Sequence, residues 1–104
     1  MNLELIKSLS LNESKNILQR FLKLSEEAGE LAQEILISQQ ASGFHEKKAG
    51  PDGICGEAVD VILVALSIFF QHGGSLEELD KISHQKSLKW QKAQNISLSH
   101  RERE

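Results

Sequence analysis

Apolar residues along this chain recur at intervals of three and four positions rather than two, which is the spacing of an amphipathic helix. Aromatic residues make up only 5% of the chain and there is a single proline. Strands are usually rich in aromatic and β-branched residues and bounded by turn residues, so this composition does not favour a sheet. The pattern therefore predicts an all-α fold.

The first long helix is expected over residues 10–40. Ser10 and Glu13 have the spacing of a capping box, in which each side chain satisfies a backbone N–H exposed at the start of a helix. Residues 42–53 follow with three glycines and Pro51 among polar residues. Such a segment is typical of a loop, and we expect it to act as a mobile lid.

A second helix is expected over residues 54–71, ending at the pair Gly73-Gly74, because glycine readily takes the left-handed conformation that closes a helix. Ser75 and Glu78 repeat the capping-box spacing and predict a third helix that reaches about Gln94.

Short segments are predicted at the two ends of the chain. Residues 2–9 are expected to add a short helix, and residues 95–104 form a polar, charged tail that we expect to fray. With 104 residues in all, the chain has room for one domain, with a core over about residues 10–94.

The second helix carries two carboxylates in an otherwise apolar stretch. Glu57 and Asp60 are three positions apart and so lie on one face, while most of their neighbours are Ala, Val, Ile, Leu or Phe. A helix of this composition is expected to be buried nearly all round. The two carboxylates interrupt the apolar stretch, which is also shorter than the roughly 20 residues that cross a bilayer, so we expect no membrane span.

Two adjacent buried carboxylates repel one another and are costly to desolvate unless a cation or basic side chains compensate them. One interpretation is therefore a buried salt bridge to Lys or Arg. The other is a bound cation, and the first long helix favours it.

That helix has an apolar stripe and a polar line beside it, at the edge of the expected core. The stripe consists of Ile17, Phe21, Leu24, Ala28, Leu31 and Ile35. The polar line consists of Asn16, Arg20, Lys23, Glu27, Glu30 and Glu34.

Two members of the polar line, Glu27 and Glu30, can face Glu57 and Asp60 across a pair of helices, whereas Glu26 points farther toward solvent. Carboxylates with water suit a hard divalent cation, so the expected ion is Mg²⁺, with Mn²⁺ as a possible substitute, rather than Zn²⁺.

The sequence Glu26-Glu27-Ala28-Gly29-Glu30, followed by Glu57-Ala58-Val59-Asp60, resembles the Glu-Glu-x-x-Glu and Glu-x-x-Asp signature of the MazG-like all-α nucleoside triphosphate pyrophosphatases. The likeness covers about residues 12–92. It implies a helical bundle completed by assembly into a dimer or tetramer, which cuts a (d)NTP between the α- and β-phosphates to give (d)NMP and pyrophosphate.

The resemblance also implies roles for individual residues. Glu27, Glu30, Glu57 and Asp60 would be the metal ligands, and Glu26 would serve an additional ion or orient the attacking water. Glu26 and Glu27 are accordingly the candidate catalytic residues, since a carboxylate of the first helix is expected to help deprotonate that water.

The expected substrate-binding residues lie on two helices. In MazG-like relatives a basic stretch on the last helix, typically Lys-x-x-x-Asn-Arg, holds the phosphates, and this chain has Gln85 where Asn is usual. A triphosphate leaves negative charge that Mg²⁺ alone does not compensate, which independently favours lysines. On the last helix the candidates are Lys81, Gln85, Lys86 and Lys89, and on the first helix Asn16, Arg20 and Lys23 are placed to meet sugar or base.

Partners and location follow from surface properties. Leu18, Leu22, Ala32 and Leu36 form a second apolar edge on the first helix, which predicts a homo-oligomer. The formal net charge of −3 provides no global positive field for nucleic acid or an anionic membrane.

A single cysteine, Cys55, cannot form an intramolecular disulfide and is expected to be a small core residue. The first residues lack the pattern of a signal peptide, so we expect a cytoplasmic protein.

Two alternatives stay open. The first keeps the site and changes the substrate to dUTP or phosphoribosyl-ATP, since phosphoribosyl-ATP pyrophosphohydrolases share a similar helical design. The second is a non-catalytic helical interaction module whose acids pair with basic residues of a partner.

Overall fold

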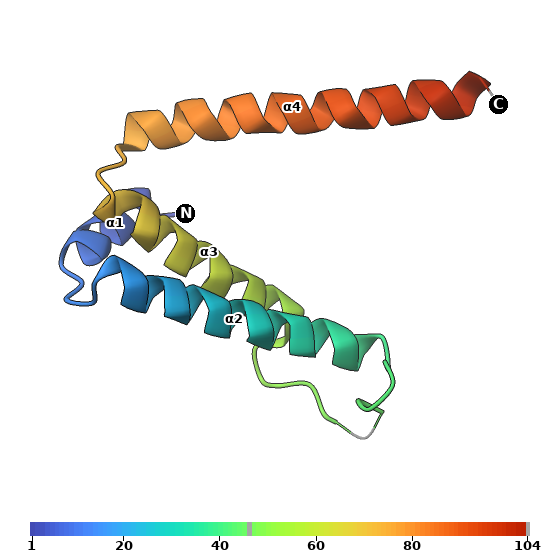
Figure 1. Ribbon diagram of the computed structural model, residues 1–104, viewed down its shortest axis with the longest axis horizontal. Helices are drawn as coiled ribbons and strands as arrows, with labels where there is room; N and C mark the ends of the chain where they lie inside the picture. Colours follow the sequence, from blue (N-terminus) through green and yellow to red (C-terminus); the bar gives the residue numbers. More distant parts are fainter. Residues whose placement is uncertain (46, 104) are drawn as a thin grey trace. The chain divides into compact units, whose positions relative to one another are not determined.

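The computed structural model describes residues 1–45 and 47–103, with side chains described up to residue 94. These residues form four helices and no strand, so the predicted all-α class is confirmed (Figure 1). The helices are α1 (Leu3–Leu11), α2 (Ile17–Ser38), α3 (Gly53–Gln71) and α4 (Leu76–Arg103). The chain divides into two compact units, Met1–Gly73 with the first three helices and Gly74–Glu104 with the fourth.

The short N-terminal helix is present, and it extends past the predicted start of the long helix. Ser10 lies within α1, where its hydroxyl donates to the Ile6 carbonyl at 2.6 Å. The predicted capping box of Ser10 and Glu13 is therefore wrong, because Ser10 is a buried residue of the preceding helix.

The capping box instead forms at Asn16 and Gln19. The Gln19 N–H donates to Asn16 Oδ1 and the Asn16 N–H donates to Gln19 Oε1, both at 2.9 Å. An amide pair at this spacing satisfies the same exposed backbone groups as the Ser-Glu pair does. The long helix thus begins at Ile17 rather than at Ser10, and it ends at Ser38 rather than Gln40.

The second predicted helix is confirmed within one residue, since α3 spans Gly53–Gln71. Its C-terminus is followed by Gly73 at φ +92°, the left-handed conformation expected there. Residues 39–52, apart from residue 46, contain neither helix nor strand and join α2 to α3, which confirms the loop.

The cap of the last helix is also confirmed. The Glu78 N–H donates to Ser75 Oγ at 3.0 Å, and the Ser75 hydroxyl donates to Glu78 Oε1 at 3.0 Å. However, α4 continues to Arg103, well beyond the expected end near Gln94.

Within the first unit α3 packs along α2 and also against α1. The α2–α3 pair is antiparallel, because Arg20 contacts Ser67 near one end and Glu27 lies beside Asp60 farther along (Figure 1). Only two apolar residues of the described chain, Val64 and Phe70, are buried. Four polar residues, Ser10, Glu27, Glu34 and Ser67, are buried as well.

The orientation of α2 differs from expectation. The polar line faces α3, and the apolar stripe and second edge lie mostly outside, with Phe21 54% and Leu22 59% exposed. A helix turns only part of its circumference toward a single antiparallel partner. Since the polar line takes that position, the apolar surface of α2 is left without cover within residues 1–73.

The expectation that α3 is buried nearly all round is likewise wrong for the single chain. Ile54, Val59, Ile62 and Leu63 are exposed apolar residues, and Cys55 is exposed rather than part of a core.

By length and composition alone, α3 is able to cross a membrane: it has 19 residues, with a mean hydropathy of 2.0 over its most apolar window, of which 17% is buried. Core helices of soluble proteins have the same composition, so the absence of a membrane span stays a prediction.

Asn16→Ala is expected to lower the free energy of unfolding by about 1 kcal/mol, the usual cost of losing a helix N-cap. Asn16→Ser, which keeps a side-chain acceptor, should retain most of the stability. Urea unfolding followed by circular dichroism measures both variants. Equal stability of Asn16→Ala and the wild type would contradict the assignment of the cap.

Candidate metal centre

Three carboxylates meet where α2 and α3 pack together. Glu27 comes from the middle of α2, and Glu57 and Asp60 come from the first two turns of α3. One oxygen of each lies within 4.8 Å of one oxygen of both others. The spacing of three between Glu57 and Asp60 places both on the face of α3 that α2 covers. The structure thus brings together three of the four predicted metal ligands.

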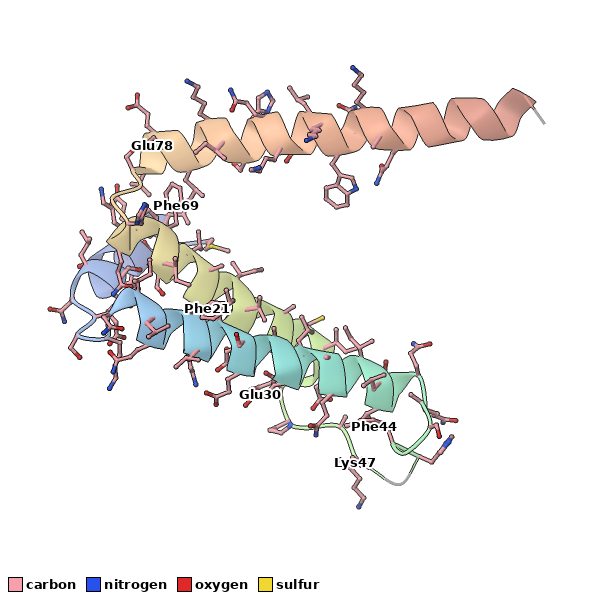
Figure 2. All side chains as sticks on the ribbon, in the orientation of Figure 1. Phe21, Glu30, Phe44, Lys47, Phe69 and Glu78 are labelled. Carbon is pink, nitrogen blue, oxygen red and sulfur yellow. The ribbon has the colours of Figure 1, made fainter. Side chains whose placement is uncertain are left out.

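The fourth predicted ligand, Glu30, is an exposed residue one turn along α2 from Glu27 (Figure 2). It lies outside the group of three but within its electrostatic field. The negative charge of Glu27 is the largest cause of a raised pKa at Glu30, and partial desolvation adds to it. Glu30 therefore lies near enough to Glu27 and Glu57 to interact with both electrostatically.

Glu27 and Glu57 each have an oxygen without a hydrogen-bond partner. Glu27 is 7% exposed, and its Oε2 atom is buried among the described residues with no donor in reach, as is Oε2 of Glu57. Such a carboxylate oxygen is costly to bury, because it has given up its water without gaining another donor. These two oxygens favour a site that accepts a cation.

One cationic side chain already contacts the group. Lys23 Nζ lies 3.0 Å from Glu27 Oε1 and 3.5 Å from Glu26 Oε1. The hydrogen bond to Glu27 is the main reason why the pKa of Lys23 is raised. The alternative of a salt bridge is thus realised for one oxygen of Glu27, while no ion pair of Glu57 or Asp60 is found among the described residues.

The pKa of Glu57 is also raised. Desolvation is the largest cause, followed by the negative charges of Glu30 and Asp60. Burial and like charges both disfavour the ionised form of a carboxyl group. A divalent cation would reverse this balance, since it stabilises the ionised form of every carboxylate around it.

The donor set indicates which cation fits. Oxygens that share one Mg²⁺ at about 2.1 Å lie roughly 2.9 to 4.2 Å apart, so the observed group needs only small side-chain movements to bind it. The group contains no Cys or His, and all-oxygen sites favour Mg²⁺ or Mn²⁺ over Zn²⁺.

The predicted substrate-binding residues Arg20 and Lys23 lie on α2, on the N-terminal side of Glu27. Arg20 donates from Nη2 and Nε to Ser67 Oγ at 2.8 and 3.1 Å, which holds its guanidinium in place, and Glu13 lies 3.8 Å away. Arg20 and Lys23 line a cavity of about 510 Å³. The other residues that line this cavity are Glu13, Lys15, Gln19, Leu22 and Glu26.

The remaining predicted residues are elsewhere. The side chain of Asn16 is engaged in the cap of α2. Glu26 is exposed and paired with Lys23, in agreement with its expected position toward solvent. The candidates on the last helix are exposed residues of α4 in the second unit, and their part in the site stays a prediction: Lys81, Gln85, Lys86 and Lys89.

The hydrogen bond between Glu34 and Gly50 was not predicted from the sequence. Glu34 belongs to the polar line, but the line does not show that its Oε1 atom accepts a hydrogen bond from the Gly50 N–H at 2.7 Å. The only indication in the sequence was that the loop contains glycines, and any of its three glycines could have made such a contact.

Comparison of the chain with models of protein families, with curated proteins and with solved structures finds no match. The fold and site define an all-helical protein with a carboxylate group suited to a hard divalent cation. Membership of the MazG-like family stays a prediction from the two acidic motifs.

In the presence of EDTA we expect the melting temperature to fall as the pH rises from the ordinary glutamate pKa near 4.5 through the raised pKa of Glu57. The folded state binds more protons than the unfolded state in this window, so stability decreases with rising pH. Glu57→Gln should flatten the dependence, because it removes the group that titrates. Calorimetry across this range measures both proteins, and identical slopes would show that Glu57 does not contribute.

Proposed function

We propose that this protein is a Mg²⁺-dependent nucleoside triphosphate pyrophosphohydrolase, which converts a (d)NTP to (d)NMP and pyrophosphate. The observation that carries the proposal is the meeting of Glu27, Glu57 and Asp60 across α2 and α3, with two of their oxygens buried and without a partner in the described part of the chain. The two acidic motifs that resemble the MazG-like signature supply these same residues.

In this proposal Glu27, Glu30, Glu57 and Asp60 hold the cation. A bound Mg²⁺ polarises phosphate oxygens and lowers the pKa of a coordinated water. Glu26 and Glu27 are the carboxylates of α2 that would orient a water and accept its proton. Glu27 is buried, whereas Glu26 is exposed and paired only with Lys23 among the described residues.

Basic residues of a cavity that Lys23 connects to Glu27 support a polyphosphate substrate. Lys15, Arg20 and Lys23 line the same cavity, and its volume of about 510 Å³ is typical of small-molecule sites. Lys23 now pairs with Glu26 and Glu27. If the carboxylates held a cation instead, the ammonium group would be available to a phosphate of the substrate.

The alternative substrates, dUTP and phosphoribosyl-ATP, would use the same carboxylate group. The residues around that group would then select the substrate. The non-catalytic interaction module is supported by the exposed apolar residues of α2 and α3. It is opposed by the position of the carboxylates, since acids that bind a partner belong on an exposed surface and Glu27 is 7% exposed.

Release of pyrophosphate from the eight common NTPs and dNTPs, from dUTP and from phosphoribosyl-ATP, with Mg²⁺ and with EDTA, tests the activity. We expect Mg²⁺-dependent formation of the monophosphate, detected by chromatography. Glu57→Gln should lower turnover by at least about 10²-fold, as the loss of one electrostatic group in an active site commonly does.

The exposed Glu4→Gln is the matched control and should retain the wild-type rate. Hydrolysis by Glu57→Gln at the wild-type rate, with circular dichroism unchanged, would exclude this site. No hydrolysis of any nucleotide by the folded wild type would favour the interaction module.

We also propose that the protein is a homo-oligomer, a dimer or tetramer. Large apolar side chains are exposed in the first unit on the apolar stripe of α2, on its second apolar edge and on the outer face of α3. They include Ile17, Leu18, Phe21, Leu22 and Ile62. Soluble monomers rarely leave so much apolar surface uncovered. A second copy of the chain offers the same surface and so provides a self-complementary cover.

Sedimentation velocity at micromolar concentration is expected to show a species larger than the 11.6 kDa chain. Phe21→Glu should shift the distribution toward the monomer, because a charge is costly to bury in an apolar interface. Gln33→Glu, on an exposed position of the same helix, is the control. A wild-type monomer would contradict the proposed assembly.

A further inference from the structure

Glu34 is a buried carboxylate with a partner on the far side of the loop. It is 8% exposed, and its Oε1 atom accepts the Gly50 N–H at 2.7 Å. Hydrogen bonds to an ionised acceptor are short and strong compared with neutral ones. Glu34 therefore ties the loop back to α2 two turns beyond the carboxylate group.

Space at Gly50 is limited by Glu34. A Cβ atom built there would lie 2.8 Å from Glu34 Oε1, so a larger residue would push the flexible carboxylate away from its hydrogen bond. The φ angle of Gly50 is not in the left-handed region, so the constraint is the close approach of the carboxylate. A glycine in this position lets backbone and side chain meet directly.

The first part of the loop is held by backbone hydrogen bonds. Ala41 N–H donates to the Leu36 carbonyl, Phe44 N–H to Ala41, and Lys47 N–H to Phe44. In the described chain beyond Lys47, the Gly50 N–H is the one group before α3 that donates to α2. The hydrogen bond to Glu34 is thus the described link that holds this part of the loop to α2.

Gly50 and Glu57 lie on either side of the start of α3. Gly50 precedes the start of α3 by three residues, and Glu57 follows that start by four. On α2, Glu27 and Glu34 are seven residues apart, which is about 10.5 Å along the axis. The hydrogen bond between Glu34 and Gly50 thus links two segments that carry the carboxylates. One is the part of α2 from Glu27 to Glu34, and the other leads from Gly50 into α3 as far as Glu57.

We propose that Glu34 is a positioning residue, which fixes the start of α3 through Gly50 and so holds Glu57 opposite Glu27. This inference rests on the proposed cation site for its functional consequence. Glu34 acts through the loop and not as a ligand, because it is absent from the three-carboxylate group and its Oε1 atom is already bonded.

Three variants separate these roles. Glu34→Gln keeps an oxygen acceptor for the Gly50 N–H and loses the charge, whereas Glu34→Leu loses both. Gly50→Ala introduces the clash with Oε1 from the other side. Gln33→Leu, on an exposed neighbouring position of α2, is the control for an apolar substitution in this helix.

The first readout is limited trypsin digestion, because Lys47 and Lys48 are exposed residues of the loop near Gly50. Lys47 is labelled on that loop in Figure 2. Cleavage there should be several-fold faster in Glu34→Leu and Gly50→Ala than in the wild type. Glu34→Gln and Gln33→Leu should be cleaved at about the wild-type rate. This readout does not depend on any enzymatic activity.

The second readout is the binding of Mn²⁺ alone to the full chain, followed by calorimetry. Supporting groups around a metal site commonly contribute 10- to 100-fold to affinity, so Glu34→Leu should weaken Mn²⁺ at least about tenfold. Glu34→Gln should rescue most of this loss, which a direct ligand would not allow.

Equal loss of Mn²⁺ affinity in Glu34→Gln and Glu34→Leu would overturn the positioning role and make Glu34 a ligand through its charge. Unchanged cleavage and affinity in Glu34→Leu would overturn the anchor itself. Absence of Mn²⁺ binding to the wild type would overturn the proposed function and the link to Glu57, while the tryptic comparison still decides whether Glu34 anchors the loop.

Discussion

The packing of α2 against α3 is organised around carboxylates that repel one another. Glu27, Glu57 and Asp60 converge where two apolar side chains would ordinarily meet. Lys23 compensates only part of this charge, and two oxygens have no hydrogen-bond partner among the described residues. A fold accepts such a cost at a site that serves a function, and a divalent cation is the compensation that suits all three acids at once.

The polar contact between the helices has a consequence for the rest of the surface. Because the polar line of α2 turns inward, the large apolar residues of the same helix turn outward, with Phe21 and Leu22 more than half exposed. Within residues 1–73 only Val64 and Phe70 are buried apolar residues. A core this small stabilises a short chain poorly. The orientation of α2 therefore underlies both the metal site proposed between α2 and α3 and the assembly proposed through the exposed apolar surface.

The site is also connected to the loop that joins its two helices. Glu34 continues the polar line past the carboxylates and uses its charge to hold a backbone N–H rather than a metal. Arg20, at the other end of the line, is held by Ser67 of α3. One line of side chains on α2 thus secures α3 at both ends of the carboxylate group, which restricts how far the acids can separate.

The sequence by itself determined the features that depend on local spacing. The all-α class, the bounds of α3, the cap at Ser75 and the shared face of Glu57 and Asp60 all follow from periodicity and from contacts within a few residues. The start of α2 was predicted at Ser10, but Ser10 lies within α1, and the side chains of Asn16 and Gln19 cap α2 instead. Which face of α2 meets α3, and the bond from Glu34 to Gly50 sixteen residues away, were decided by the tertiary structure. Helical periodicity shows which residues share a face, but the partner of that face is set by long-range packing.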